Sequence, residues 1–178
     1  MTKKILVFGA SNSKASINKQ LASYAANLLE QVEVNLLDLN NFEMPIYSID
    51  REGTTGIPAL AKNFKQQIQE ADGILISFAE HNGAYTTAFK NIYDWMSRLE
   101  GSVWQDKPML LMATSPGGRG GQGVLELAYN TFSYGNKQVV GSFSLPSFQQ
   151  NFSTEEGIKD ADLKRQLLTL IEKFQQIL

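Results

Sequence analysis

The sequence predicts an α/β fold in which one doubly wound parallel β-sheet is covered by helices on both faces. The hydrophobic period switches repeatedly between strand-like runs and helix-like stripes, which is typical of alternating strands and helices. Five of the runs are short and largely apolar, as expected of strands buried on both faces of a parallel sheet. The 178 residues, 43% hydrophobic and 19% charged, suit one globular domain, which we expect to span residues 1–178.

The first half of the chain contains two predicted strands and two predicted helices. Ile5–Phe8 is an apolar run that ends at a glycine, and a stripe of helical spacing follows over residues 16–28. Val32–Leu39 reads as the second strand. A looser stretch over residues 41–56 then leads to a helix over residues 58–71, whose proline suits a first helical turn.

The second half repeats this alternation. Gly73–Phe78 is the third predicted strand, and a helix follows it with its apolar positions between residues 89 and 99. Pro108–Ala113 is the fourth strand, followed by a glycine-rich loop and a helix over residues 124–134. Val139–Leu145 is the fifth strand.

The last predicted element is a long helix that runs to Leu178. Ser153 and Glu156 match the capping-box pattern, which predicts that the helix begins there. Five strands in under 180 residues favour the flavodoxin-like order 2-1-3-4-5. In that order the first, third and fourth strands are neighbours, and ligands bind beyond their carboxyl ends. The three loops that leave these strands should therefore converge on one site.

The composition excludes several kinds of chemistry. The chain has no cysteine, which rules out disulfides, thiol redox chemistry and cysteine-bound zinc, and its one histidine rules out a histidine-rich metal site. A formal net charge of −2 predicts no broad attraction to nucleic acid or to anionic membranes. The apolar run at the start is too short for a membrane span, so we expect a cytoplasmic protein.

The first loop combines small residues with hydroxyl and amide groups and then opens a helix. Backbone N–H groups in such a loop can approach an anion, and the start of the helix adds positive potential. Lys14 offers a charge. The loop matches neither a dinucleotide fingerprint nor a Walker P-loop, so a dinucleotide or a triphosphate is disfavoured as its main ligand. Taken alone, the loop supports a phosphate site and a plain helix cap with solvated serines about equally. The candidate ligands are Ser11, Ser13, Ser16, Ile17 and Asn18.

The second loop presents a carboxylate, an imidazole, an amide and a glycine in succession, at Glu80, His81, Asn82 and Gly83. The three polar groups can read the edge of a planar ring, and the glycine permits close approach. A simple turn into a helix would need only one capping group, which favours a binding function here.

The third loop, residues 114–121, contains four glycines. Glycine costs conformational entropy, so such a loop is expected where the backbone bends sharply or lies against a ligand. Ser115, Pro116, Gly117 and Gly118 are the candidate ring contacts, and Arg119 could pair with a phosphate or bridge subunits. A flexible surface loop is the alternative, which the expected convergence of the three loops makes less attractive.

A hydrolase is a weaker interpretation of the same residues. Ser11 would be the nucleophile and His81 the base, with Glu80 or Asp94 to orient it. Adjacent residues on an extended segment point in different directions, and the chain has no G-x-S-x-G elbow. A receiver-type phosphorylation domain is also disfavoured, because no acidic pair follows the first strand.

Two further patterns are less specific. Lys90, Asp94 and Arg98 are spaced four apart and predict a ladder of ion pairs along one helix. Apolar and aromatic residues in the looser stretch could roof a pocket or meet a second subunit: Phe42, Met44, Ile46 and Tyr47.

A family resemblance emerges from these motifs. Residues 80–98, which read E-H-N-G-A and then F-K-N-I-Y-D-W-M-S-R, closely resemble the P-E-Y-N-G-S…L-K-N-A-I-D-W-L-S-R signature of the NADPH-dependent FMN reductase family. The third loop is similar to that family's S-P-G-G-R-G-G loop. The first loop resembles its G-S-x-R-x-x-S-x-N phosphate motif, with Ser11, Ser16 and Asn18 matching.

The resemblance implies a flavodoxin-like enzyme that binds FMN and takes hydride from NADPH or NADH. Members of the family pass electrons to quinones, azo dyes, metal oxyanions or free flavins, usually as homodimers or homotetramers. The reactive group is the cofactor, so no catalytic side chain and no metal are implied. By position, the matching residues of the first loop would hold the FMN phosphate, and the second and third loops would border the isoalloxazine ring.

This chain departs from the family pattern at four positions. Ala10 replaces the first-loop glycine, and Ser13 stands in place of the arginine, which predicts weaker retention of FMN. His81 replaces the tyrosine of the second loop and Ala79 its proline. These departures keep two rivals open: an electron carrier, which the modest net charge disfavours, and a flavin-free interaction protein on the same fold.

Overall fold

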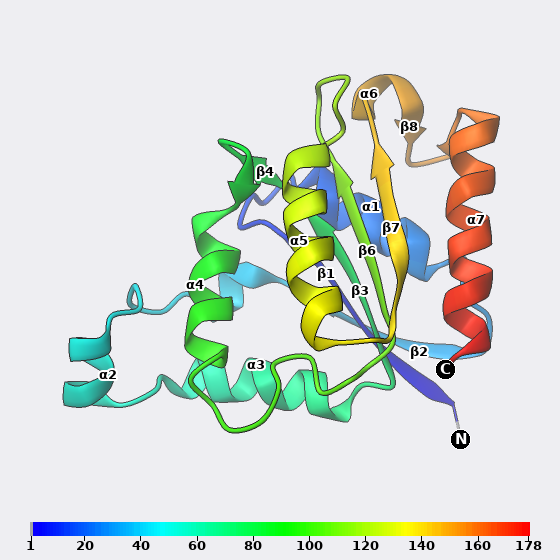
Figure 1. Cartoon of the computed structure of the whole chain (residues 1–178). Helices are drawn as coiled ribbons and strands as arrows, with labels where there is room; N and C mark the ends of the chain where they lie inside the picture. The colour runs from blue at the N-terminus through cyan, green and yellow to red at the C-terminus, as the bar shows by residue number, and fades with distance from the viewer. Residues whose placement is uncertain (1) are drawn as a thin grey trace.

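The computed structural model describes residues 2–178 and contains a five-stranded sheet in the order β2-β1-β3-β6-β7. All of its pairings are parallel, and its strands numbered among themselves follow the order 2-1-3-4-5 (Figure 1). The predicted flavodoxin-like topology is therefore confirmed. The strands are Lys3–Ala10 (β1), Val32–Leu37 (β2), Gly73–Phe78 (β3), Met109–Thr114 (β6) and Val139–Leu145 (β7).

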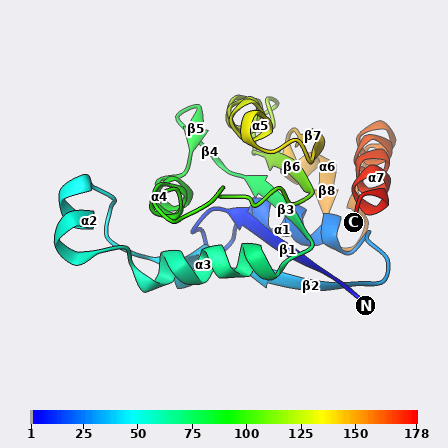
Figure 2. The same cartoon turned by 60° about the horizontal axis from the view of Figure 1, so that its bottom comes forward.

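Helices cover both faces of the sheet because the strand side chains alternate between two apolar clusters. On β1, Leu6 and Phe8 point into one cluster, while Ile5 and Val7 point into the other. Helices α3, α4 and α5 close the first cluster, and α1 and α7 close the second (Figure 2). Their bounds are Ile17–Ala26 (α1), Ala59–Glu70 (α3), Thr87–Met96 (α4), Gln122–Gly135 (α5) and Ala161–Gln176 (α7).

Several short elements decorate this framework. Helix α2 has no buried residue and lies out beyond α4, away from the sheet (Figures 1 and 2). Two small antiparallel hairpins, β4–β5 and β8–β9, lie outside the main sheet. These elements are Leu39–Phe42 (a 3₁₀ turn, η1), Ile49–Thr55 (α2), Glu80–His81 (β4), Ala84–Tyr85 (β5), Phe148–Asn151 (α6), Phe152–Ser153 (β8) and Gly157–Ile158 (β9).

The predicted start of the last helix is wrong. The Ser153 hydroxyl does accept a hydrogen bond from the Glu156 backbone N–H at 3.1 Å, but this bond lies in the turn of the β8–β9 hairpin. Helix α7 begins later, with Asp160 as its N-cap, because that carboxylate accepts from the N–H groups of Asp162 and Leu163.

The predicted ion-pair ladder forms only in part. Lys90 and Asp94 pair at 2.7 Å on α4, as the spacing predicts. Arg98 follows the end of α4 and pairs instead with Glu52 of α2 at 2.9 Å, which ties the projecting helix to the body. Trp95 is fully buried, and its indole N–H donates to the Pro45 carbonyl at 2.7 Å.

The register of the sheet places three loop origins side by side. Ala10 pairs with Phe78, and Phe78 pairs with Ala113, so β1, β3 and β6 end at the same edge. The strand order reverses between β1 and β3, which makes this edge the switch point where ligands of such sheets bind.

Candidate functional site

The three predicted loops meet in a pocket of about 300 Å³ at the switch point. Its size lies at the lower end of the range for small-molecule pockets. The first loop contributes Ser11, Ser13, Ser16, Ile17 and Asn18, the second Glu80 and His81, and the third Ser115 and Pro116. Asn82, Gly83, Gly117 and Gly118 lie in the same two loops but outside this lining.

The first loop leads into α1 with donors that no protein group uses. Ser16 is the N-cap, and its hydroxyl accepts from the Lys19 N–H at 3.1 Å while its own hydrogen stays free to donate. Within residues 2–178, the backbone N–H groups of Lys14, Ala15 and Ile17 have no protein acceptor. Together with the start of α1, these donors suit an anion.

The close packing of α1 on the sheet fixes the position of this loop. A Cβ atom at Gly9 would lie 2.8 Å from the Cα of Lys19 and 2.9 Å from the carbonyl carbon of Asn18. Both are backbone atoms that cannot move aside easily. Glycine at position 9 therefore lets the first turn of α1 rest directly on the end of β1.

The side chain of Asn18 has a structural role that the sequence did not reveal. It is buried, its Oδ1 accepts from the Ser77 hydroxyl at 2.7 Å and from the Thr114 N–H at 3.0 Å, and its Nδ2 donates to the Thr114 carbonyl at 3.0 Å. These bonds join α1 to the ends of β3 and β6. The Asn18 backbone N–H, which lies in the first turn of α1, remains available to a ligand.

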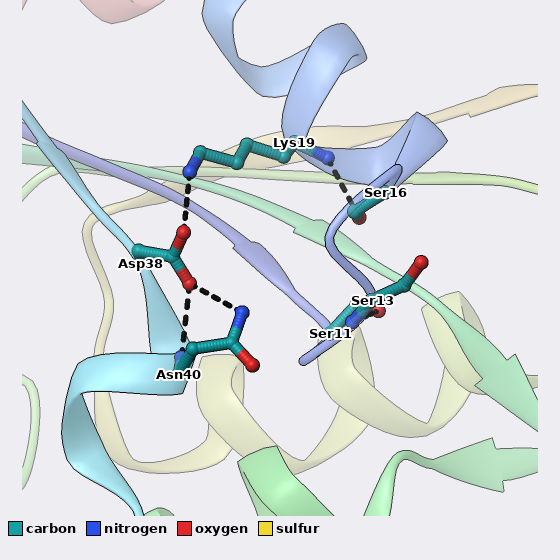
Figure 3. A network of polar contacts seen from close by, with 6 residues as sticks. All are labelled: Ser11, Ser13, Ser16, Lys19, Asp38 and Asn40. Atoms are coloured by element: carbon teal, nitrogen blue, oxygen red, sulfur yellow. Dashed lines mark hydrogen bonds and ion pairs between the residues drawn. The ribbon is translucent and has the colours of Figure 1, made fainter.

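A charged network lies beside the first loop. Lys19 reaches from α1 to Asp38, which follows β2, with Nζ 2.8 Å from Oδ2 (Figure 3). The hydrogen bond from Lys19, with two further bonds from the Asn40 backbone and side chain, lowers the pKa of Asp38 from 3.8 to about 2. Because Asp38 neutralises Lys19, the free cation of this loop is Lys14, which has no carboxylate partner among residues 2–178.

The second loop is a tight β-hairpin. Asn82 and Gly83 have φ angles of 52° and 77°, so both central residues of the two-residue turn are left-handed. This is the turn type for which Asn-Gly is the preferred sequence, and the pair could have predicted the hairpin. Behind the turn, the side chain of Glu80 lies against Gly123 in the first turn of α5.

The four glycines of the third loop fall into two pairs. Gly120 and Gly121 have φ angles of 59° and 74°, and a side chain at position 120 would collide with Ser144. These two are required by the fold itself. Gly117 and Gly118 have no positive φ angle, and a Cβ atom at either would meet nothing closer than the Ser115 hydroxyl at 3.9 Å. Their exposed backbone is left free to lie against a ligand.

A fourth segment, after β7, completes the site and was missed in the sequence. Gln149 lines the pocket, and the N–H groups of Ser147 and Phe148 donate to the carbonyls of Gly117 and Ser115 at 3.0 and 3.1 Å. These bonds hold the carbonyl side of the third loop. The predicted strand order contained the signal, because β7 neighbours β6 and its following loop must lie at the same edge.

The hydrolase interpretation finds no support in the geometry. No hydrogen bond joins Ser11 to His81 in the part of the chain that the structure describes. Glu80 lies against α5, and Asp94 is bound to Lys90. The members of the proposed triad thus have other partners or none.

A second pocket, of about 240 Å³, lies on the other side of the first loop. Phe42, Met44 and Ile46 line it together with Asn12, so the looser stretch does roof a pocket. Phe42 and Met44 are buried, whereas Ile46 is 68% exposed. Tyr47 does not line this pocket and instead packs edge-on against Trp95.

None of the helices over residues 2–178 combines the length and the apolar character needed to cross a bilayer.

Comparison with known proteins places this chain in a family. The sequence profile of the NADPH-dependent FMN reductases matches residues 3–150. A 2-hydroxy-1,4-benzoquinone reductase of Burkholderia sp. is 39% identical over 122 residues, which cover 67% of this chain and 64% of that protein. An NADPH:quinone oxidoreductase of Arabidopsis thaliana is 28% identical over 182 residues, covering 97% of this chain and 90% of the relative.

A solved structure shares the fold. The flavoenzyme NAD(P)H:(acceptor) oxidoreductase FerB of Paracoccus denitrificans superposes with a TM-score of 0.74 at 24% identity, covering 98% of this chain and 96% of that chain. The matched profile runs from β1 into α6 and includes all three loops of the pocket. The chain therefore belongs to the NADPH-dependent FMN reductase family of flavodoxin-like oxidoreductases.

Proposed function

We propose that this protein is an FMN-dependent NAD(P)H oxidoreductase that passes electrons to a quinone or a similar small acceptor. The observation that carries the proposal is a set of unused backbone donors at one edge of the sheet: those of the first loop, which lines the pocket, and the bare backbone of the third loop next to it. An anion joined to a flat polar ring is the ligand chemistry that this arrangement suits.

The first loop fits the phosphate of FMN. The free N–H groups of Lys14, Ala15 and Ile17 and the hydroxyls of Ser11 and Ser16 surround the start of α1. Lys14, which has no carboxylate partner among residues 2–178, would add a positive charge. Phosphate binding would then rest on N–H groups and hydroxyls, which are weaker ligands than an arginine fork.

The second and third loops fit the isoalloxazine ring. Within residues 2–178, the N–H groups of Gly117 and Gly118 have no protein acceptor, and nothing in the protein covers the positions their side chains would occupy. They can donate to the carbonyl oxygens and ring nitrogens on the polar edge of a flavin. His81, exposed on the hairpin, borders the same pocket.

When bound, FMN supplies the hydride and electron chemistry, which no side chain of this site provides. The side chains bind, orient and polarise, and no catalytic residue is assigned among them. Because one pocket serves the ring, NAD(P)H and the acceptor would use it in turn, and we expect ping-pong kinetics.

The relatives favour a quinone as the acceptor, since the Burkholderia and Arabidopsis proteins are both named for quinone reduction. Azo compounds, metal oxyanions and free flavins are further candidate acceptors, to be compared with a quinone in the same assay. NADPH and NADH are both candidates for the hydride donor. We also propose a homodimer or homotetramer, as the family resemblance implies.

The direct test is an FMN fluorescence titration of the purified protein, followed by NADPH and NADH oxidation with a benzoquinone. We expect flavin quenching on binding and steady oxidation that needs no partner reductase. A protein that binds no FMN would refute the proposal and favour a flavin-free interaction protein. Binding without NAD(P)H oxidation would favour the electron carrier.

Substitution of Ser13 by arginine tests the phosphate end of the site. Ser13→Arg adds the fork that the family places there, and we expect the Kd for FMN to fall about tenfold, the effect of one charge-assisted contact. The Kd for riboflavin, which lacks the phosphate, should not change. An unchanged FMN Kd would mean that the phosphate does not lie at the first loop.

A further inference from the structure

The second loop touches the helix that follows the third loop, through a contact that the motif of neither loop explains. The hairpin β4–β5 carries Glu80, and the third loop runs into α5, whose first turn contains Gly123. A Cβ atom built at position 123 would collide with Oε1 of Glu80, and it would lie 3.6 Å from the Gly83 carbonyl oxygen. The carboxylate of Glu80 therefore rests directly on the backbone of α5.

The start of α5 is well suited to receive a carboxylate. Its N-cap is Gly121, which has no side chain to cap the helix, and the first turn contains no acidic residue. In the described chain, the N–H groups of Gly123 and Val124 have no protein acceptor outside the helix, so Glu80 meets the start of α5 through its charge and not through a hydrogen bond. A negative charge at a helix start is favourable, and Glu80 is the carboxylate that the fold brings there.

Glycine is otherwise a poor choice at position 123. It is helical, with no positive φ angle, and glycine destabilises a helix relative to alanine. Gly135 at the other end of α5 has open space around it, so a side chain there would meet nothing. At position 123 the missing side chain has one evident consequence, which is that the Glu80 carboxylate can approach.

We propose that Glu80 and Gly123 form a latch that holds the β4–β5 hairpin on α5 and so sets the width of the flavin pocket. Gly123 is then a positioning residue that never touches the ring. The consequence for the ring rests on the proposed function, but the latch itself does not depend on FMN.

The test combines Gly123→Ala and Glu80→Ala with their double variant, and uses Gly135→Ala as the matched control in the same helix. Gly123→Ala should raise the Kd for FMN about fivefold and shift the visible absorption bands of bound flavin, because the Glu80 carboxylate must turn away from the start of α5 and the hairpin loses this contact. In the Glu80→Ala background the collision is absent, so adding Gly123→Ala should change the Kd less than twofold. Gly135→Ala should leave both the Kd and the spectrum unchanged.

Amide hydrogen exchange of the apo-protein gives a readout without flavin. Exchange over residues 80–85 should speed up about fivefold in Gly123→Ala and in Glu80→Ala, but not in Gly135→Ala. If wild type binds no FMN, the proposed function fails while this exchange experiment still tests the latch. Equal effects of Gly123→Ala with and without Glu80, or no change in exchange, would overturn the latch.

Discussion

Replacement of Asn18 by alanine should lower the free energy of unfolding of the apo-protein, independently of any effect on FMN binding. The substitution removes three buried hydrogen bonds and leaves the Ser77 hydroxyl and the N–H and C=O groups of Thr114 without those partners. A buried polar group left unpaired costs about 1–3 kcal/mol, and the serine hydroxyl can partly recover by rotating. We therefore expect the free energy of unfolding to fall by about 3–5 kcal/mol.

Urea denaturation of the apo-protein, followed by circular dichroism, measures this loss. A protein of this length should lose very roughly 10 °C in Tm for the same change. Asn12→Ala is the matched control, because Asn12 is an exposed amide of the same loop with no protein partner among the described residues, and it should stay within about 0.5 kcal/mol. If Asn18→Ala cost less than about 1 kcal/mol while FMN affinity collapsed, the amide would be a ligand of the cofactor and our reasoning would be wrong.

Three more changes test how α1 and α3 are held in place. Gly9→Ala should cost about 2–3 kcal/mol in urea denaturation, because the new Cβ atom meets backbone of α1; a neutral result would contradict that packing. Asp38 has its pKa lowered from 3.8 to about 2, chiefly by Lys19, so its contribution is present above pH 4 and is lost as the pH falls toward 2. With a side chain 36% exposed, that contribution is about 1 kcal/mol after allowance for screening, and Lys19→Met should flatten the stability profile between pH 4 and 2. Lys65→Met should cost about 1–2 kcal/mol, because the buried ammonium donates to three carbonyls of residues 99–101, and an unchanged urea midpoint would count against this role.

The sequence predicted best the strands that are buried at every residue and the helices that are buried along one face. Strands β3 and β6 are buried throughout, which is why their apolar runs were clear. Helix α2 has no buried residue, so it has no stripe to detect. It is held by polar contacts, in which Glu52 accepts hydrogen bonds from both Tyr47 and Arg98, and the separation of 46 residues between Glu52 and Arg98 leaves no local pattern.

Local motifs failed where the same hydrogen bond serves two structures. The Ser153 hydroxyl accepts from an N–H three residues ahead in a hairpin turn, just as an N-cap would in a helix. Asn18 shows the same limit at the site. Its position matched a phosphate motif, but its amide was assigned correctly only once the ends of β3 and β6 were seen beside it. Residue type indicates which bonds a side chain can make, and the fold decides which ones it does make.

The glycines near the site have different roles. In the third loop, Gly120 and Gly121 satisfy the fold, through positive φ angles and close contacts, whereas Gly117 and Gly118 satisfy nothing within the chain. Gly123 lies in a regular helix, where its missing side chain leaves room for the Glu80 carboxylate. Because the bare backbone at residues 117–118 also lies next to the pocket, we expect the flavin ring there, and alanine at these positions should weaken FMN binding without lowering the stability of the apo-protein.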